Sequence, residues 1–180
     1  MPIRPAASDD IPAIAAIYDE AVRTGTASFE LTPPGVAEMT RRHAAVVEAG
    51  FPYLVMEEGG VVLGYAYASA FRPRIAYRHT VENSIYVTPA AQGRGVGRAL
   101  LEALIAACEA AGFRQMVAVI GDSGNAGSIG LHRACGFAAI GTLPATGLKF
   151  GRWIDTVLMQ RPLGPGAATV PEEADLGFSG

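Results

Sequence analysis

The chain has 180 residues, of which 50% are hydrophobic and 17% charged, with a formal net charge of −3. These values predict one globular domain and, without a Lys- or Arg-rich block, argue against binding to nucleic acid or an anionic membrane. No apolar run reaches the roughly 18–20 residues of a membrane span, and the N-terminus lacks the apolar segment of a signal peptide. Cys108 and Cys135 stand alone in helical patterns, which is typical of reduced core residues. We therefore expect a cytoplasmic protein.

Hydrophobic periodicity predicts the element order β-α-α-β-β-β-α-β-α-β-β. The expected elements are strand 3–5, helix 8–23, helix 32–50, strands 52–57, 61–70 and 80–87, helix 96–111, strand 116–120, helix 125–135, and strands 138–142 and 153–161. A meander of strands before a β-α-β-α portion indicates an α/β fold with a mixed central sheet. Residues 164–180 are rich in Gly and Pro and have no periodicity. We expect a single domain over 1–163 and a flexible tail over 164–180.

A glycine-rich turn follows strand 80–87 and opens an amphipathic helix. Its sequence over 92–98 is Gln-Gly-Arg-Gly-Val-Gly-Arg. A dinucleotide fingerprint fails here because Arg98 occupies the third glycine position, and a mononucleotide P-loop fails because the chain has no Gly-Lys pair. The remaining hypothesis is a pyrophosphate held by backbone N–H groups at a helix N-terminus. The alternative is an ordinary glycine-rich turn.

Three groups of side chains are candidates for chemistry or binding. Glu82 shares one strand face with Ser84 and Tyr86, so it is either a general base in a cleft or a solvent-facing glutamate. Asn125, Ser128 and His132 form a polar stripe on the short helix, and His132 is either a proton-transfer group or a surface or hydrogen-bond-satisfied histidine without a chemical role. Arg72 and Arg74 suit a carboxylate, phosphinate or sulfone oxygen, or form a solvated basic loop. No His/Cys/Asp cluster has the spacing of metal ligands.

The turn 92–97, together with Asn125 and the segment Leu131–Phe137, resembles the GCN5-related N-acetyltransferase (GNAT) family. A closer resemblance links the chain to the branch of phosphinothricin and methionine sulfone/sulfoximine acetyltransferases. The segments that carry it are 25–30, 52–55, 64–67, 71–74, 77–78, 80–82, 117–121 and 151–153. Together they span roughly residues 3–163.

This resemblance implies a GNAT-like mixed sheet flanked by helices, with acetyl-CoA as co-substrate. The pantetheine arm is expected on the backbone of Ile85, Tyr86 and Val87, with Asn125 and Ser128 opposite. The pyrophosphate is expected on the turn formed by Gln92, Gly93, Arg94, Gly95, Val96, Gly97 and Arg98.

The resemblance also implies roles for the reacting and substrate-binding groups. Glu82 is expected to be the base, and His132, where the wider family commonly has tyrosine, to be an acid or a base. Arg72 and Arg74 are expected to bind the carboxylate of the substrate, with Phe29, Thr80 and Glu82 beside it. The branch is dimeric, so we expect a homodimer in which Lys149 and Trp153 reach a site across the interface.

The expected function is therefore acetylation of the α-amino group of a small amino acid or analogue, by direct attack on the thioester. Methionine sulfone, methionine sulfoximine and phosphinothricin are the expected substrates. Two alternatives stay open: acetylation of a protein N-terminus or another amine, and a non-catalytic acyl-CoA-binding module.

Overall fold

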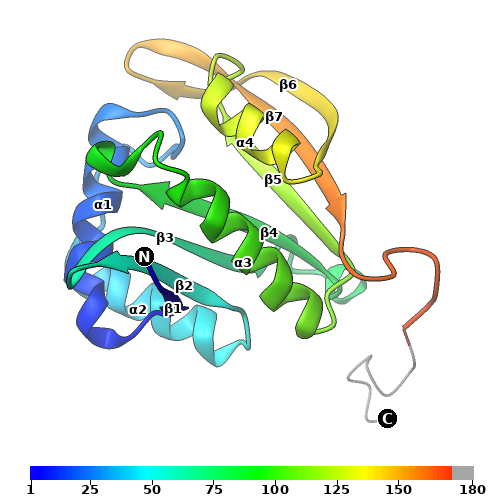
Figure 1. Cartoon of the computed structure of the whole chain (residues 1–180). Helices are drawn as coiled ribbons and strands as arrows, with labels where there is room; N and C mark the ends of the chain where they lie inside the picture. The colour runs from blue at the N-terminus through cyan, green and yellow to red at the C-terminus, as the bar shows by residue number, and fades with distance from the viewer. Residues whose placement is uncertain (172–180) are drawn as a thin grey trace.

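The computed structural model describes residues 1–171, in which seven strands form one sheet flanked by four α-helices (Figure 1). The strands are β1 (Ile3–Pro5), β2 (Tyr53–Glu58), β3 (Val61–Ala70), β4 (Thr80–Val87), β5 (Gln115–Gly121), β6 (Ala138–Lys149) and β7 (Arg152–Pro162). The helices are α1 (Ile11–Thr24), α2 (Gly35–Glu48), α3 (Val96–Ala110) and α4 (Ala126–Ala134). The predicted order of elements is confirmed. None of the helices within residues 1–171 combines the length and apolar character required to cross a membrane.

The sheet is mixed, as predicted. Its strand order is β1-β2-β3-β4-β5-β7-β6, and the β4–β5 pair is parallel while the other neighbouring pairs are antiparallel. Pairing between β3 and β4 continues to Val87, whereas pairing between β4 and β5 ends at Asn83 and Ala118. Beyond Asn83, the two central strands therefore diverge.

Two hydrophobic cores cover opposite faces of the sheet. On the α3 face, the fully buried Leu100 and Leu104 pack with Met116 and Met159. On the α1 and α2 face, the core is built by the buried side chains Ile11, Ile14, Val22, Met39, Tyr53, Val55 and Tyr65. Alternate residues of β2 serve the two cores, because successive side chains of a strand point to opposite faces. Cys108 and Cys135 are free and buried, as expected.

One strand is longer than predicted. Strand β6 was expected to end at Thr142, but it continues through Pro144 and Gly147 to Lys149. It is the edge strand of the sheet, where a proline needs no ladder partner, and its register shifts twice, between Ala139 and Gly141 and between Leu143 and Gly147. The long β6–β7 hairpin brings Lys149 to the loop after α1.

The chain after β7 continues along the body of the domain. Leu163 is fully buried, the Gly164 N–H donates to Glu109 Oε1 at 3.2 Å, and Arg114 Nη1 donates to Thr169 Oγ1 at 3.0 Å. The segment 172–180 of the predicted flexible tail lies outside the described residues.

Candidate active site

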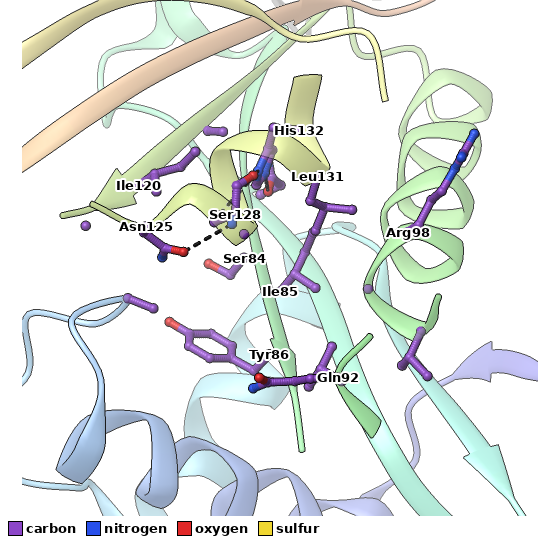
Figure 2. A pocket seen from close by; sticks show the side chains of 18 of the residues that line it. Ser84, Ile85, Tyr86, Gln92, Arg98, Ile120, Asn125, Ser128, Leu131 and His132 are labelled. Carbon is purple, nitrogen blue, oxygen red and sulfur yellow. Dashed lines mark hydrogen bonds between the residues drawn. The ribbon is translucent and has the colours of Figure 1, made fainter. Parts of the chain in front are cut away.

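A cleft of about 590 Å³ opens where β4 and β5 diverge. Figure 2 shows Asn125 and Ser128 of α4 on one side of it and Tyr86 and Gln92 on the other. The predicted site residues that line the cleft are Glu82, Ile85, Tyr86, Val87, Gln92, Gly93, Gly95, Val96, Gly97, Arg98, Asn125, Ser128 and His132. The cleft thus brings together predicted residues from β4, α3, α4 and the glycine turn.

The diverging strand exposes backbone donors to the cleft. The Thr88 N–H donates to Leu63 O of β3 at 2.9 Å. Because the N–H groups of a strand alternate between its two edges, those of Ile85 and Val87 point to the opposite edge. Strand β5 no longer pairs with that edge, so an extended ligand can accept hydrogen bonds there.

The glycine turn forms the far end of the cleft. Gly93 and Gly95 adopt φ values of 73° and 82°, a left-handed conformation that favours glycine, and Gly95 is the N-cap of α3. A Cβ added at either glycine meets no atom within 4 Å, so this side of the turn is open. The first N–H groups of α3 have no partner within the helix, which makes this terminus suited to an anion.

The two arginines of the turn are engaged with acidic side chains. Arg94 pairs with Glu58 at 2.8 Å and does not line the cleft, so its predicted part in holding pyrophosphate is limited to its backbone. Arg98 lines the cleft and pairs with Glu102 at 2.8 Å, one turn along α3.

The short helix α4 presents its polar stripe to the cleft. Asn125 is its N-cap, and its Oδ1 accepts the Ser128 N–H at 3.1 Å. His132 is only 4% exposed, so it is not a surface histidine, and its role in proton transfer stays a prediction. Its Nδ1 lies 2.8 Å from Ser128 O and its Nε2 lies 3.0 Å from Asn83 Oδ1. The pKa of His132 is lowered because burial disfavours the charged ring, and the hydrogen bond to the Ser128 carbonyl offsets only part of this effect.

Asn83 is a buried cleft residue that the sequence analysis missed. It is 7% exposed, it lines the cleft, and its Nδ2 donates to Val117 O at 3.1 Å. The available signal was the alternation of β4, which places Asn83 on the same face as Val81 and Ile85. A polar side chain on a core face requires a partner, and that partner is His132.

Glu82 lies at the inner end of the cleft, half-buried and opposite Ser69 of β3. The pKa of Glu82 is raised because burial disfavours the charged carboxylate, and the positive charge of Arg72 offsets only part of this rise. A carboxylate with a raised pKa accepts a proton more readily near neutral pH than an exposed one, which suits a general base.

The other predicted substrate residues lie outside the lining of the cleft. Arg72 and Arg74 are exposed, and the Arg72 guanidinium lies 5.1 Å from the centroid of the Phe71 ring. Thr80 begins β4 and pairs with Gln115. Phe29 is 40% exposed and packs so closely that a Cβ added at Gly147 falls 2.4 Å from its Cε2.

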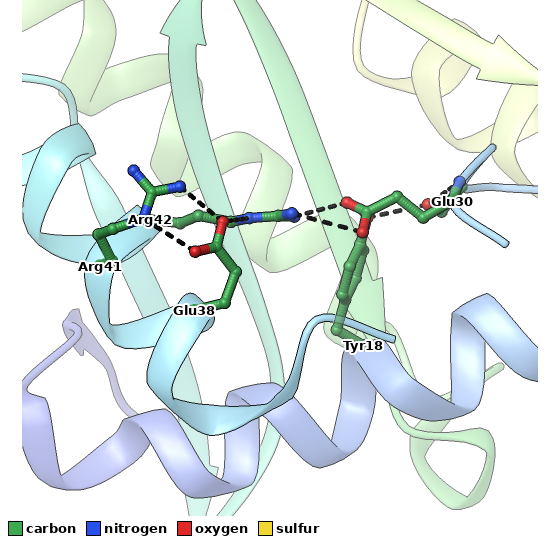
Figure 3. Close-up of polar contacts among 6 residues, drawn as sticks. Tyr18, Glu30, Glu38, Arg41 and Arg42 are labelled. Atoms are coloured by element: carbon green, nitrogen blue, oxygen red, sulfur yellow. Dashed lines mark hydrogen bonds and ion pairs between the residues drawn. The ribbon is translucent and has the colours of Figure 1, made fainter. Parts of the chain in front are cut away.

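The loop that carries Phe29 is held from two sides. On one side, Glu30 accepts hydrogen bonds from Tyr18 at 2.9 Å and from Arg42 at 2.5 Å, and Arg42 also pairs with Glu38 (Figure 3). On the other side, the buried Lys149 Nζ donates to Gly25 O and Ser28 O, both at 2.8 Å.

Lys149 therefore binds a loop of its own chain, and its expected reach across a subunit interface stays a prediction. Trp153, the other residue of that expectation, is 65% exposed. Within residues 1–171, no cluster of three His, Cys, Asp or Glu side chains is placed to hold a metal ion.

Comparisons with known proteins agree with this geometry. The sequence model of the acetyltransferase (GNAT) family matches residues 14–137. The chain is 59% identical to the phosphinothricin N-acetyltransferase of Alcaligenes faecalis, over 94% of this chain and 86% of that protein. It is 46% identical to the L-methionine sulfoximine/L-methionine sulfone acetyltransferase of Pseudomonas paraeruginosa, over 91% of this chain and 95% of that protein.

A solved structure has the same fold. The crystal structure of a GNAT superfamily phosphinothricin acetyltransferase from Sinorhizobium meliloti, in complex with AcCoA, superposes with a TM-score of 0.92 at 53% identity. The match covers 96% of this chain and 93% of that one. With the mixed sheet, the diverging strands and the open glycine turn, these matches lead to one conclusion: the chain belongs to the GNAT family of acetyltransferases.

Proposed function

We propose that the protein transfers the acetyl group of acetyl-CoA to the α-amino group of a small amino acid or analogue, with methionine sulfone, methionine sulfoximine and phosphinothricin as candidate substrates. The observation that carries the proposal is the divergence of β4 from β5. It joins the free edge of β4, the N-terminus of α3 and Glu82 in one continuous cleft. The relatives named for these same substrates support this choice.

Each part of the cleft fits one part of acetyl-CoA. The first-turn N–H groups of α3 and the open glycines suit the pyrophosphate. The N–H groups of Ile85 and Val87 suit the amide carbonyls of the pantetheine arm and the thioester oxygen, as an added strand does. Asn125 and Ser128 border the same arm from α4.

Glu82 is the proposed base of the reaction. An amino group of ordinary pKa is mostly protonated near neutral pH, so it must lose a proton before it can attack. Glu82 takes that proton, directly or through one water molecule. The new C–N bond then replaces the C–S bond, and the departing thiolate takes up a proton. Because the backbone N–H groups of β4 are fixed in place, they stabilise the negative charge that develops on the thioester oxygen.

The loop after β3 is the proposed binding site for the carboxylate of the acceptor. The positive charge of Arg72 lowers the pKa of Glu82, which supports a guanidinium within electrostatic reach of the base. Arg74 lies two residues further on, so an α-carboxylate can be held while the α-amino group faces Glu82. Phe29 and Thr80 border the acceptor in this proposal.

A homodimer is the proposed assembly. Strand β6 is an edge strand, and its hairpin with β7 exposes Ile140, Leu143, Leu148, Phe150 and Trp153. An apolar edge of this kind favours association with a second copy. Sedimentation of the wild type and of Trp153→Glu tests the proposal, because a charge at this position should shift the dimer toward the monomer. The cytoplasmic location stays a prediction.

The decisive experiment measures release of the CoA thiol with a panel of amino acids and analogues. We expect turnover with at least one of the three candidate substrates and a fall in kcat of at least about 100-fold for Glu82→Gln. Glu20→Gln, an exposed carboxylate on α1, is the matched control and should behave as the wild type. Binding of acetyl-CoA without turnover on any amine would favour the non-catalytic alternative.

A second variant separates amino acids from other acceptors. Arg72→Ala should raise KM for an amino acid about tenfold or more, because the ion pair with the carboxylate is lost. Arg23→Ala removes an exposed arginine on α1 and serves as control. An unchanged KM for Arg72→Ala would favour a protein N-terminus or another amine as the acceptor.

A further inference from the structure

The contacts of the buried His132 ring define which of its protons can move. Nε2 lies 3.0 Å from Asn83 Oδ1, and Nδ1 lies 2.8 Å from Ser128 O and 3.4 Å from Ser128 Oγ. The ring forms a T-shaped pair with the Phe137 ring, with the centroids 5.0 Å apart. Each ring nitrogen therefore has a defined polar neighbour.

The orientation of Asn83 is fixed by β5. Its Nδ2 donates to Val117 O at 3.1 Å. If the amide were turned over, its oxygen would face that carbonyl oxygen and the hydrogen bond would be lost. The amide oxygen therefore faces His132, and it can only accept a hydrogen.

The neutral ring carries one N–H, and both nitrogens face an acceptor. If the hydrogen is on Nδ1, the lone pair of Nε2 faces Asn83 Oδ1, where no donor is available because Val117 engages Nδ2. If the hydrogen is on Nε2, the hydroxyl of Ser128 can turn its hydrogen toward Nδ1. The second tautomer alone gives both nitrogens a hydrogen-bond partner, the hydroxyl of Ser128 at 3.4 Å for Nδ1, and it holds the Nδ1 lone pair 2.8 Å from Ser128 O.

The charged ring satisfies the same contacts. The imidazolium donates from Nε2 to Asn83 Oδ1 and from Nδ1 to Ser128 O. In both charge states Nε2 keeps its hydrogen, and only the hydrogen on Nδ1 is gained or lost. The hydroxyl of Ser128 is the cleft-lining group next to that hydrogen.

We propose that Asn83 is a positioning residue that keeps a proton on Nε2 of His132, and that Ser128 Oγ relays the Nδ1 proton between His132 and the cleft. This inference rests on the proposed acetyl transfer. As the C–S bond breaks, the hydroxyl hydrogen of Ser128 passes to the thiolate sulfur and the Nδ1 hydrogen passes to Ser128 Oγ. His132 is left neutral and regains its proton from solvent. The ammonium loses two protons through Glu82 to solvent, and solvent returns one proton to His132, so the net reaction forms the amide and the CoA thiol and releases one proton.

Charged groups near the ring do not compete for this role. The ionisable side chains on the elements around the ring include Glu82, Arg98, Asp122, Arg133, Cys135 and Arg161, and the Arg161 guanidinium donates to Cys135 O at 2.5 Å. Glu82 lies on the opposite face of β4 from Asn83, and Arg133 is exposed. Asp122 and Arg98 are held in ion pairs with other residues, and Cys135 is buried at the end of α4.

The first test is nitrogen-15 NMR of the histidine rings, assigned with His132→Gln. In the wild type above the titration of His132, we expect the hydrogen on Nε2 and the lone pair on Nδ1. In Asn83→Ala, we expect the hydrogen to move to Nδ1, where Ser128 O accepts it. A wild-type ring with its hydrogen on Nδ1 overturns the inference. This readout needs no turnover, so it is independent of the proposed function.

The second test measures the relay. Ser128→Ala removes only the hydroxyl, leaving the backbone N–H that Asn125 caps, so the variant should fold. We expect kcat to fall roughly 10- to 100-fold with KM for acetyl-CoA within about twofold, and Ser128→Thr to recover most of the loss. If Ser128→Ala and Asn83→Ala change the melting temperature but leave kcat and its pH profile as in the wild type, both residues are structural and the relay is wrong.

Discussion

The buried ammonium group of Lys149 provides a sharp test of how the substrate loop is held. Lys149 is the only lysine among the 180 residues, and its Nζ donates to Gly25 O and Ser28 O at 2.8 Å each. A hydrogen bond from a charged donor contributes about 1.5–3 kcal/mol. Lys149→Met keeps the apolar stem and removes both bonds, so we expect the free energy of unfolding to fall by about 3–6 kcal/mol.

Urea unfolding measures the loss in the free energy of unfolding, and steady-state kinetics show whether it affects binding of the amino-acid substrate or of acetyl-CoA. Because the loop carries Phe29, KM for the amino-acid substrate should rise in Lys149→Met, while the affinity for acetyl-CoA stays within about twofold of the wild type. Lys149→Arg, which keeps the charge and several donors, should recover part of the stability. Since no other lysine is present, an amine reagent followed by mass spectrometry should modify Lys149 far more slowly in the folded than in the unfolded protein.

Two results would refute this reasoning. A loss of less than about 1 kcal/mol in Lys149→Met would mean that the two carbonyl groups find other donors, including water. Rapid modification of Lys149 in the folded protein would mean that the hairpin and the loop separate readily, so that the ammonium is not held between them.

Four further predictions follow from the burial and charge of single residues. Burial raises the pKa of Glu82, so the folded state loses stability when this carboxyl ionises as the pH rises through its folded pKa. Glu82→Gln should therefore have a higher melting temperature than the wild type at about pH 8 and the same melting temperature at about pH 4. Equal melting temperatures at both pH values would contradict this. The charge of Arg72 lowers the pKa of Glu82, so Arg72→Ala should move the acid limb of the pH profile of kcat/KM to higher pH. An unchanged acid limb would mean that Arg72 does not affect the ionisation of the base. In Gly147→Ala, the new Cβ would lie 2.4 Å from Phe29 Cε2, so the Phe29 ring must move. KM for the acceptor should then rise without a change in the affinity for acetyl-CoA. Unchanged kinetics would exclude Phe29 from the acceptor site. Leu104 is fully buried on α3, so Leu104→Ala should lose about 2–5 kcal/mol in urea unfolding, and a loss below about 1 kcal/mol would mean that the core closes over the gap.

The elements around the cleft could be predicted because their signals are local. The apolar positions of α3 recur with helical spacing, and Val96, Leu100, Leu101, Leu104, Ile105 and Cys108 are all buried. The turn before it needs two residues with positive φ, and the sequence supplies Gly93 and Gly95. Such signals depend on a few neighbouring residues, so one sequence is sufficient to read them.

The contacts that hold the cleft together could not be predicted, because they join residues far apart in the sequence. Lys149 meets Gly25 only because β6 continues past Pro144 as an edge strand, and the sequence pattern there is typical of a loop. The partnership of Asn83 with His132 depends on how α4 lies against the end of β4. The chemical types of these residues are visible in the sequence, but the distances between them are not.

The short pairing of β4 with β5 also has a mechanical consequence. Only four residue pairs join the half of the sheet that contains β1–β4 to the half that contains β5–β7. Side-chain hydrogen bonds cross the same boundary beside the cleft, among them Asn83 to His132, Asn83 to Val117 O, and Lys149 to the loop after α1. We expect these hydrogen bonds to limit how far the two halves of the sheet can separate at the cleft. Substitutions of Asn83 or Lys149 should therefore alter the rate of product release, even where the residue does not contact the ligand.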